Sequence, residues 1–167
     1  MARTLVWAAL WLAATVVQAP AQPSPGDVVA SLAGQWTYRS FHNNPAPVGD
    51  DPQKVLDLIF AEATFIFDPP SGNTIKGMID WGSGGLDLSG TVQSTGPDGP
   101  VIVYLVGTGR PNSQTAGWQY DYHAHVTHRW PNGVNQVTAL TGSVIRAKPH
   151  GSAAAGYVAS FIAVKRP

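Results

Sequence analysis

Apolar and polar residues alternate with a period of two along most of this chain of 167 residues. Successive side chains of a β-strand point to opposite faces of a sheet, so this period predicts strands with one buried face. In the segment 86–93, apolar residues and a glycine hold the even positions, while polar residues hold the odd ones. Eight strands are expected in all, near Trp36, Phe65, Ile79, Leu88, Val103, Tyr122, Leu140 and Phe161.

Short turn signals join most of these runs, as in the segments 68–73, 82–85 and 95–100. Strands that are adjacent in the sequence should therefore pair as antiparallel hairpins. Eight strands in simple order leave two unpaired edges unless the sheet closes on itself. We predict an all-β fold, a single eight-stranded antiparallel up-and-down barrel, with a β-sandwich as the alternative. A barrel of this size is either filled by its side chains or holds one small ligand.

Two further local predictions concern segments outside this simple pattern. At most one short helix is expected, near residues 51–58, with Asp51 as its N-cap and Pro52 as its first residue. The segment 118–130 is expected as one long strand, joined by a tight turn to a partner strand at 134–146.

The first residues have the order of a secretory signal peptide. Arg3 precedes an uncharged apolar run from Leu5 to Val17, and Ala19 and Ala21 are the small residues that a signal peptidase reads. The run is shorter than the roughly 20 residues of a membrane span, so none is expected. We expect cleavage after Ala21 and export to the periplasm or the medium. The predicted division is signal peptide 1–21, flexible leader 22–33, with a helical turn at 28–33, and β-barrel domain 34–167.

Composition limits the kinds of partner. The chain has no cysteine, so an exported form would have no disulfides and would depend on its core for stability. Ten basic and ten acidic residues balance, and loss of Arg3 with the signal would leave nine basic residues against ten acidic ones. Such a chain lacks the basic face that nucleic acid or an anionic membrane requires.

The first strand opens with Gly34-Gln35-Trp36. This resembles the G-x-W start of the calycin barrels, the lipocalins and avidins, and the segment 140–144 is also similar to avidins. The resemblance implies an eight-stranded barrel in which the tryptophan packs near the closed end, against a basic residue of the last strand. Lys165 or Arg166 would supply that cation here. No set of ligand contacts carries over from this short motif.

The segment 118–130 separates aromatic from polar residues. With a period of two, one face holds Trp118, Tyr120, Tyr122, Ala124, Val126, His128 and Trp130, and the other holds Gln119, Asp121, His123, His125, Thr127 and Arg129. In the plainest interpretation the aromatic face is core and the polar face is solvated. In a second, the aromatic face is the wall of a binding cavity.

A third interpretation makes the polar face a metal or acid–base cluster. His123 and His125 point the same way on a strand, and such a pair can bind zinc or copper if a third ligand joins it. The candidates for that third ligand are His42, His150, Asp80 and Asp87, and nothing in the sequence selects among them.

We therefore expect an exported barrel that binds a small, largely apolar molecule. The expected ligand-binding residues are Trp36, Tyr38, Trp81, Trp118, Tyr120 and Tyr122. The alternative is an enzyme of the same fold, of isomerase, lyase or cyclase type, with His123, His125 and Asp121 as catalytic candidates. A third alternative is an assembly module that pairs with copies of itself to form a homo-oligomer. Whether the protein has a cofactor is unknown from the sequence, and the common nucleophile, zinc and phosphate-loop motifs are missing from it.

Single charged residues give weaker signals. Arg39 and Arg110 could each meet a ligand carboxylate, although surface positions are the simpler expectation. Glu62 begins an apolar strand and is expected at the strand end, in water.

Overall fold

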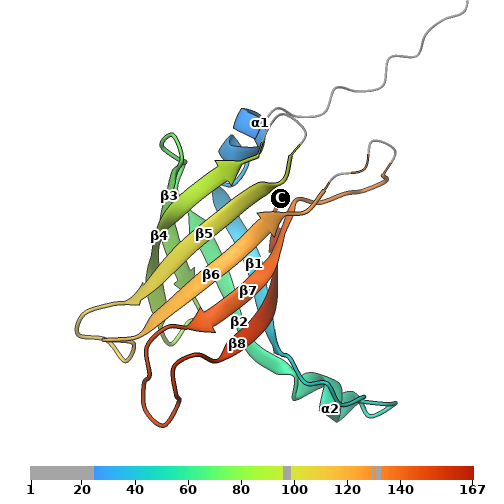
Figure 1. Cartoon of the computed structure of the whole chain (residues 1–167), viewed down its shortest axis with the longest axis vertical. Helices are drawn as coiled ribbons and strands as arrows, with labels where there is room; N and C mark the ends of the chain where they lie inside the picture. The colour runs from blue at the N-terminus through green and yellow to red at the C-terminus, as the bar shows by residue number, and fades with distance from the viewer. Residues whose placement is uncertain (1–24, 96–98, 129, 131–132) are drawn as a thin grey trace, which may run out of the picture.

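A computed structural model describes residues 25–95, 99–128, 130 and 133–167. They form a closed barrel of eight antiparallel strands, each paired with its neighbours in sequence, and β1 pairs with β8 (Figure 1). The strands are β1 (Gly34–His42), β2 (Ile59–Phe67), β3 (Thr74–Asp80), β4 (Gly85–Ser94), β5 (Val101–Gly109), β6 (Gln119–Val126), β7 (Ala139–Arg146) and β8 (Val158–Lys165). The predicted up-and-down barrel is confirmed, and the β-sandwich is not observed.

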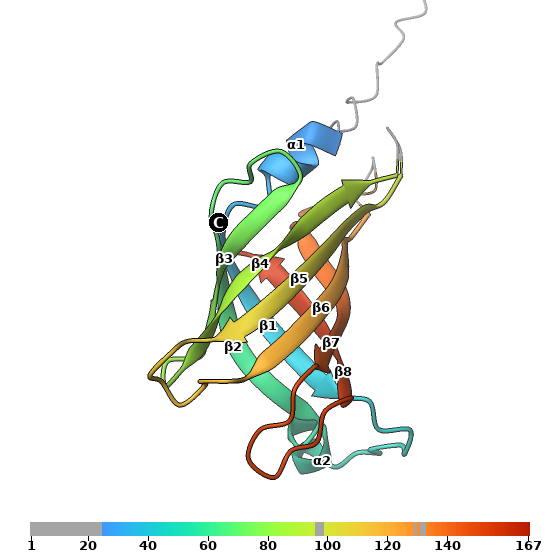
Figure 2. The ribbon, with the colours of Figure 1, turned by 60° about the vertical axis from the view of Figure 1, so that its left-hand side comes forward.

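Two short helices mark the two ends of the barrel. Helix α1 (Pro25–Ala30) lies at one end, and helix α2 (Pro52–Leu56) lies at the other, together with the β5–β6 and β7–β8 loops (Figures 1 and 2). We call these the α1 end and the α2 end. The predicted cap of α2 is confirmed, because the Asp51 side chain accepts a hydrogen bond from the backbone N–H of Gln53 at 3.0 Å. Helix α1 is a second helix, inside the segment expected to be a flexible leader. Among the described residues, no helix has the length and apolar character needed to cross a membrane.

Alternation along the strands places one side of each inside the barrel. In β4, Leu86, Leu88 and Val92 are buried, as their period of two predicts. The β1–β2 ladder contains one irregularity: Ser40 lies opposite Ala61, and the next residue, Phe41, lies opposite Ile59. Phe60 is therefore an extra residue in β2, and such a bulge turns a side chain out of the regular alternation.

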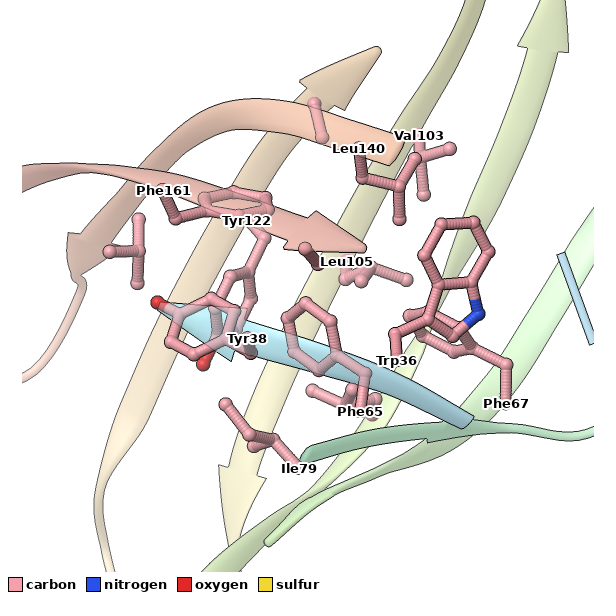
Figure 3. Close-up of a cluster of buried hydrophobic side chains, with 14 of the residues drawn as sticks. Trp36, Tyr38, Phe65, Phe67, Ile79, Val103, Leu105, Tyr122, Leu140 and Phe161 are labelled. Atoms are coloured by element: carbon pink, nitrogen blue, oxygen red, sulfur yellow. The ribbon is translucent and has the colours of Figure 1, made fainter. Parts of the chain in front are cut away.

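Aromatic rings fill the middle of the barrel (Figure 3). The ring centroid of Phe65 on β2 lies 4.7 Å from that of Tyr38 on β1 and 5.5 Å from that of Tyr122 on β6. Phe161 on β8 lies 5.3 Å from Tyr38. Gly107 makes room for this cluster, since a Cβ there would lie 3.1 Å from the Tyr122 ring. Rings from opposite walls thus meet on the barrel axis, and a ligand at this level would have to displace them.

Trp36 closes the α1 end. Its indole is fully buried, and its N–H donates to the carbonyl oxygen of Leu32 at 2.9 Å. The ammonium group of Lys165, on the last strand, lies 5.9 Å from the centre of the Trp36 ring and donates to the carbonyl of Ser31. Of the two cations that the calycin resemblance suggested, Lys165 is therefore the one beside the tryptophan. Leu32 and helix α1 pack onto this end, in the part of the chain where the sequence predicted a helical turn at 28–33.

The strand expected over 118–130 is shorter than predicted. β6 ends at Val126, and its partner β7 begins at Ala139 rather than at residue 134. Beyond the ladder, the side chain of Gln136 pairs with both backbone groups of Trp130, at 2.6 Å each. The Gln136 side chain thus takes the place that a backbone partner would have in a β-ladder at Trp130. Residues 129, 131 and 132, which include most of the expected tight turn, lie outside the described residues.

Candidate functional site

The polar face of β6 lies on the outside of the barrel. His123 and His125 are exposed, whereas Tyr120, Tyr122 and Ala124 are buried. The His123 ring packs edge-on against Tyr104, and His125 is hydrogen-bonded to the Thr141 hydroxyl at 3.1 Å. No group of three His, Cys, Asp or Glu side chains in the described part of the chain could hold a metal ion. The pair His123 and His125 thus has no third metal ligand among these residues.

The six expected ligand-binding residues lie at three levels of the barrel. Trp36 belongs to the α1 end, and Tyr38 and Tyr122 belong to the filled middle. Trp81, Trp118 and Tyr120 lie toward the α2 end, beyond the rings of the middle. Trp81, the residue after β3, is in phase with the buried Ile79, and Trp118 and Tyr120 are in phase with the buried Tyr122 of β6. The structure therefore brings only half of the expected set together there.

Five further side chains join these three. We call the group of eight the α2-end cluster, and it consists of His42, Phe60, Trp81, Trp118, Tyr120, Arg146, His150 and Tyr157. Phe60 enters it because of the β2 bulge and contacts the rings of His42, Tyr157 and Tyr120 at 5.3, 5.5 and 6.5 Å. The Tyr157 hydroxyl is hydrogen-bonded to His42 Nδ1.

Three of the seven rings in the cluster form a stack across the α2 end. The Trp81 and Trp118 indoles lie 6.3 Å apart with an interplanar angle of 18°, and the His150 ring lies 3.7 Å from Trp118 at 13°. Trp81 follows β3, Trp118 precedes β6, and His150 lies in the β7–β8 loop. Since β3 and β6 are three strands apart in the barrel, the stack connects separate parts of the wall.

Local hydrogen bonds hold the stack in place. The buried Thr115 hydroxyl donates to the carbonyl of Gly85 at 2.9 Å, and the Thr115 carbonyl accepts from the backbone N–H of Trp118 at 2.9 Å. His150 exchanges two backbone hydrogen bonds with Ala153, at 3.1 and 2.9 Å. Gly84 lies against the Trp81 indole, because a Cβ there would come within 3.0 Å of Nε1. The hydrogen bonds thus hold the backbone at Trp118 and His150 in place, and Gly84 leaves room for the Trp81 indole.

A polar network runs beside the stack. Arg146 Nε donates to the Tyr120 hydroxyl oxygen at 3.1 Å, and that hydroxyl lies 2.8 Å from Nε2 of His150. Because the Tyr120 oxygen already accepts from Arg146, its own proton is free to point at His150 Nε2. That direction requires a neutral imidazole whose proton lies on Nδ1. Burial, followed by the nearby Arg146 cation, lowers the pKa of His150, which favours the same neutral form.

Two buried tyrosines lie below this network. Burial raises the pKa of Tyr38 and of Tyr122 far above the usual range of a phenol, and the neighbouring Tyr120 adds to both shifts. A hydrogen bond with Ser40 opposes the shift at Tyr38. Figure 3 shows the hydroxyl groups of both on the side of the ring cluster that faces away from Trp36 and Phe67. Both therefore remain protonated near neutral pH and can donate a hydrogen bond.

The network gives a prediction for the titration of His150. We expect a midpoint below its ordinary value of 6.5 in an NMR titration, and we expect Arg146→Gln to raise it part of the way back. The unfolded chain binds this proton at a higher pH than the folded protein does. The stability that neutral His150 contributes is therefore fully present above pH 6.5. It decreases as the pH falls from there toward the folded midpoint. A midpoint unchanged by Arg146→Gln would show that the cation does not act on the imidazole.

A depression lies on the outer wall. It has a volume of about 520 Å³ and is lined by Gln35, Glu62, Ala63, Thr64, Ile66, Asp80, Trp81, Gly82 and Arg166. Arg166 already donates to oxygen atoms of Thr37, Gln35 and Thr64, at 3.2 to 3.4 Å. This depression is open to solvent, and the N–H groups of its Arg166 already have acceptors. The α2-end cluster is therefore the stronger candidate for a binding site.

The isolated charges named from the sequence belong to surface pairs. Arg39 Nε lies 2.7 Å from Glu62, with both side chains more than half exposed. Arg110 Nε lies 2.9 Å from Asp87.

The sequence analysis missed Arg146, although it is in phase with the buried Leu140 and Val144 of β7. Its period of two with these residues was the signal in the sequence that could have placed Arg146 on the inward side of the strand.

The α2-end cluster thus combines a ring stack, a half-buried cation and a neutral histidine that faces a phenol. Such a set can hold a planar apolar molecule by stacking, orient it through Tyr120 or Arg146, and exchange a proton with it. No protein-family model, no curated protein and no solved structure matches the chain.

Proposed function

We propose that this protein binds a small, largely apolar molecule at the α2 end of a calycin-like barrel. The observation that carries the proposal is the stack of Trp81, Trp118 and His150, which lies beyond the filled middle of the barrel. The outer rings, Trp81 and His150, are half-buried, and such rings gain contact area when a flat ligand covers them.

The packing of the middle supports this location. Tyr38, Phe65 and Tyr122 meet on the barrel axis, so the ligand would rest above them rather than among them. The Trp36–Lys165 pair at the α1 end supports the calycin-like part of the proposal, because that arrangement is the one the G-x-W resemblance implied.

Trp118→Ala tests the proposed site with a neutral fluorescent probe, N-phenyl-1-naphthylamine. We expect the affinity to fall roughly tenfold, because the central ring of the stack is lost. Trp130→Ala is the matched control: this indole is 69% exposed and belongs to the β6–β7 connection, so its loss should leave the affinity unchanged. Equal affinity of wild type and Trp118→Ala, measured by fluorescence titration, would contradict the proposal.

An acid–base enzyme at the same cluster is the second candidate. The observation that favours it is the 2.8 Å contact between the Tyr120 hydroxyl and His150 Nε2 beside a cation. An enzyme of this kind would convert a ligand that binds at the stack, and Tyr120→Phe would abolish the conversion while retaining most of the affinity. Chromatography and mass spectrometry of such a ligand after incubation would distinguish an enzyme from a binding protein.

We also propose that the protein is exported. The support is the order of Arg3, the apolar run to Val17 and the small residues Ala19 and Ala21. Expression of the full chain in a bacterial host should yield, in the periplasm or medium, a product that begins at Gln22 by mass spectrometry. A cytoplasmic product that retains Met1 would refute this.

A further inference from the structure

The side chain of Arg146 is the charged group of the α2-end cluster, and its surroundings are neutral. It follows Leu140 and Val144 on the inward side of β7 and is half-buried. Its guanidinium carbon lies 5.8 Å from the centre of the Phe60 ring, 5.8 Å from that of Tyr120 and 5.4 Å from that of Tyr157. Three aromatic faces thus surround one cation.

The hydrogen bonds of Arg146 leave part of its donor capacity unused. Nε donates to the Tyr120 hydroxyl at 3.1 Å, and Nη1 donates to the carbonyl of Ala154 at 3.1 Å. Nη2 has no partner among the described residues. Both acceptors are uncharged, so neither of these bonds brings an anion to the guanidinium.

Of the three other arginines of the described chain, two pair with a carboxylate, while the third, Arg166, has uncharged partners but lies on the outer wall. Arg39 and Arg110 each lie within 3 Å of a carboxylate, and Arg166 is held on the outer wall by three side-chain oxygen atoms. For Arg146, the part of the chain that the structure describes contains no carboxylate within the 4.0 Å of an ion pair. Withdrawing a cation from water is costly unless an opposite charge approaches it.

We propose that the ligand of this site is an organic anion: a planar, apolar body with one carboxylate or sulfonate group, which Arg146 binds. The inference rests on the proposed function and specifies the chemical class of the ligand. The planar body would stack on Trp81 or His150, the outer rings of the stack, while the anionic oxygens would accept from Nη2 and Nη1 of Arg146. A guanidinium is suited to this task because it presents its N–H groups in a fixed fork. The neutral His150 adds no competing charge.

Two fluorescent probes with one ring system test this class. 8-Anilinonaphthalene-1-sulfonate carries a sulfonate, and N-phenyl-1-naphthylamine is the same molecule without it. We expect Arg146→Gln to weaken binding of the sulfonate probe about 10- to 100-fold, the range for a hydrogen bond to a charged group. Binding of the neutral probe should change by less than about twofold, because ring stacking remains. Arg166→Gln is the matched control and should change neither affinity.

The outcomes separate this inference from the proposed function. If Trp118→Ala weakens both probes but Arg146→Gln spares the sulfonate probe, the anion inference is wrong and the binding site stands. If Arg146→Gln weakens both probes equally, Arg146 supports the structure of the site and does not select an anion. If neither probe binds the wild type, the proposed function fails, and this inference fails with it.

A wild-type measurement covers the case in which Arg146→Gln does not fold. 1-Naphthoate and 1-naphthalenemethanol differ in the charged group on the same rings. We expect the carboxylate to displace bound N-phenyl-1-naphthylamine at a concentration at least about tenfold lower than the alcohol. Equal displacement by the two compounds would overturn the proposal.

Discussion

Replacement of Phe65 by alanine is expected to lower the free energy of unfolding by about 3–5 kcal/mol, the range for a buried phenylalanine. Phe65 is fully buried, and its ring contacts those of Tyr38, Phe67, Tyr122 and Phe161. Its loss leaves a void on the barrel axis that neighbouring strands cannot close, because they are fixed by ladders on both sides.

Urea denaturation monitored by circular dichroism measures this change. Tyr104→Ala is the control, since Tyr104 lies on the outer wall with 38% of its surface exposed. We expect the control to change the free energy of unfolding by less than about 1 kcal/mol. Equal losses for the two variants would mean that the middle of the barrel is not packed as described.

Trp36→Ala should have an effect of similar size at the α1 end, about 3–5 kcal/mol. The substitution removes a fully buried indole, its hydrogen bond to Leu32 and the ring beside Lys165. Because Leu32 connects helix α1 to this indole, α1 should also lose protection from hydrogen exchange, while β4 and β5 retain theirs.

Trp36→Phe provides the matched comparison. It keeps most of the apolar volume but loses the indole N–H, so the carbonyl of Leu32 loses its donor. We expect a loss between wild type and Trp36→Ala, with α1 still protected. If Trp36→Ala left the exchange of α1 unchanged, the indole would not be what holds the helix in place.

The alternation of residues was sufficient to predict the fold. The expected strand positions match β1 to β8, because in a closed barrel every strand has one inward face and repeats the same period. The cap of α2 was also predictable, because Asp51 and Pro52 act through their immediate neighbours.

The α2-end cluster was predictable only in part. Trp81, Trp118 and Tyr120 follow from their phase in the strands, whereas Phe60 depends on a bulge for which the sequence has no signal. His150 comes from a loop, and its contact with Trp118 depends on how the β7–β8 connection folds back. Whether the interior was full or hollow depended on ring contacts across the barrel, which no local pattern contains.

The ring stack and the filled middle together lead to one expectation: a ligand binds at the α2 end and leaves the rest of the barrel unchanged. Four indole groups report on it separately. Trp81 and Trp118 lie in the cluster, Trp36 closes the α1 end, and Trp130 is exposed in the β6–β7 connection.

The most direct test is an NMR titration of ¹⁵N-labelled protein with N-phenyl-1-naphthylamine, with the indole N–H signals assigned by tryptophan-to-phenylalanine substitutions. We predict that the signals of Trp81 and Trp118 shift with one shared affinity, while those of Trp36 and Trp130 stay in place. A shift of Trp36 with Trp81 and Trp118 unmoved would place the ligand at the α1 end and contradict the account.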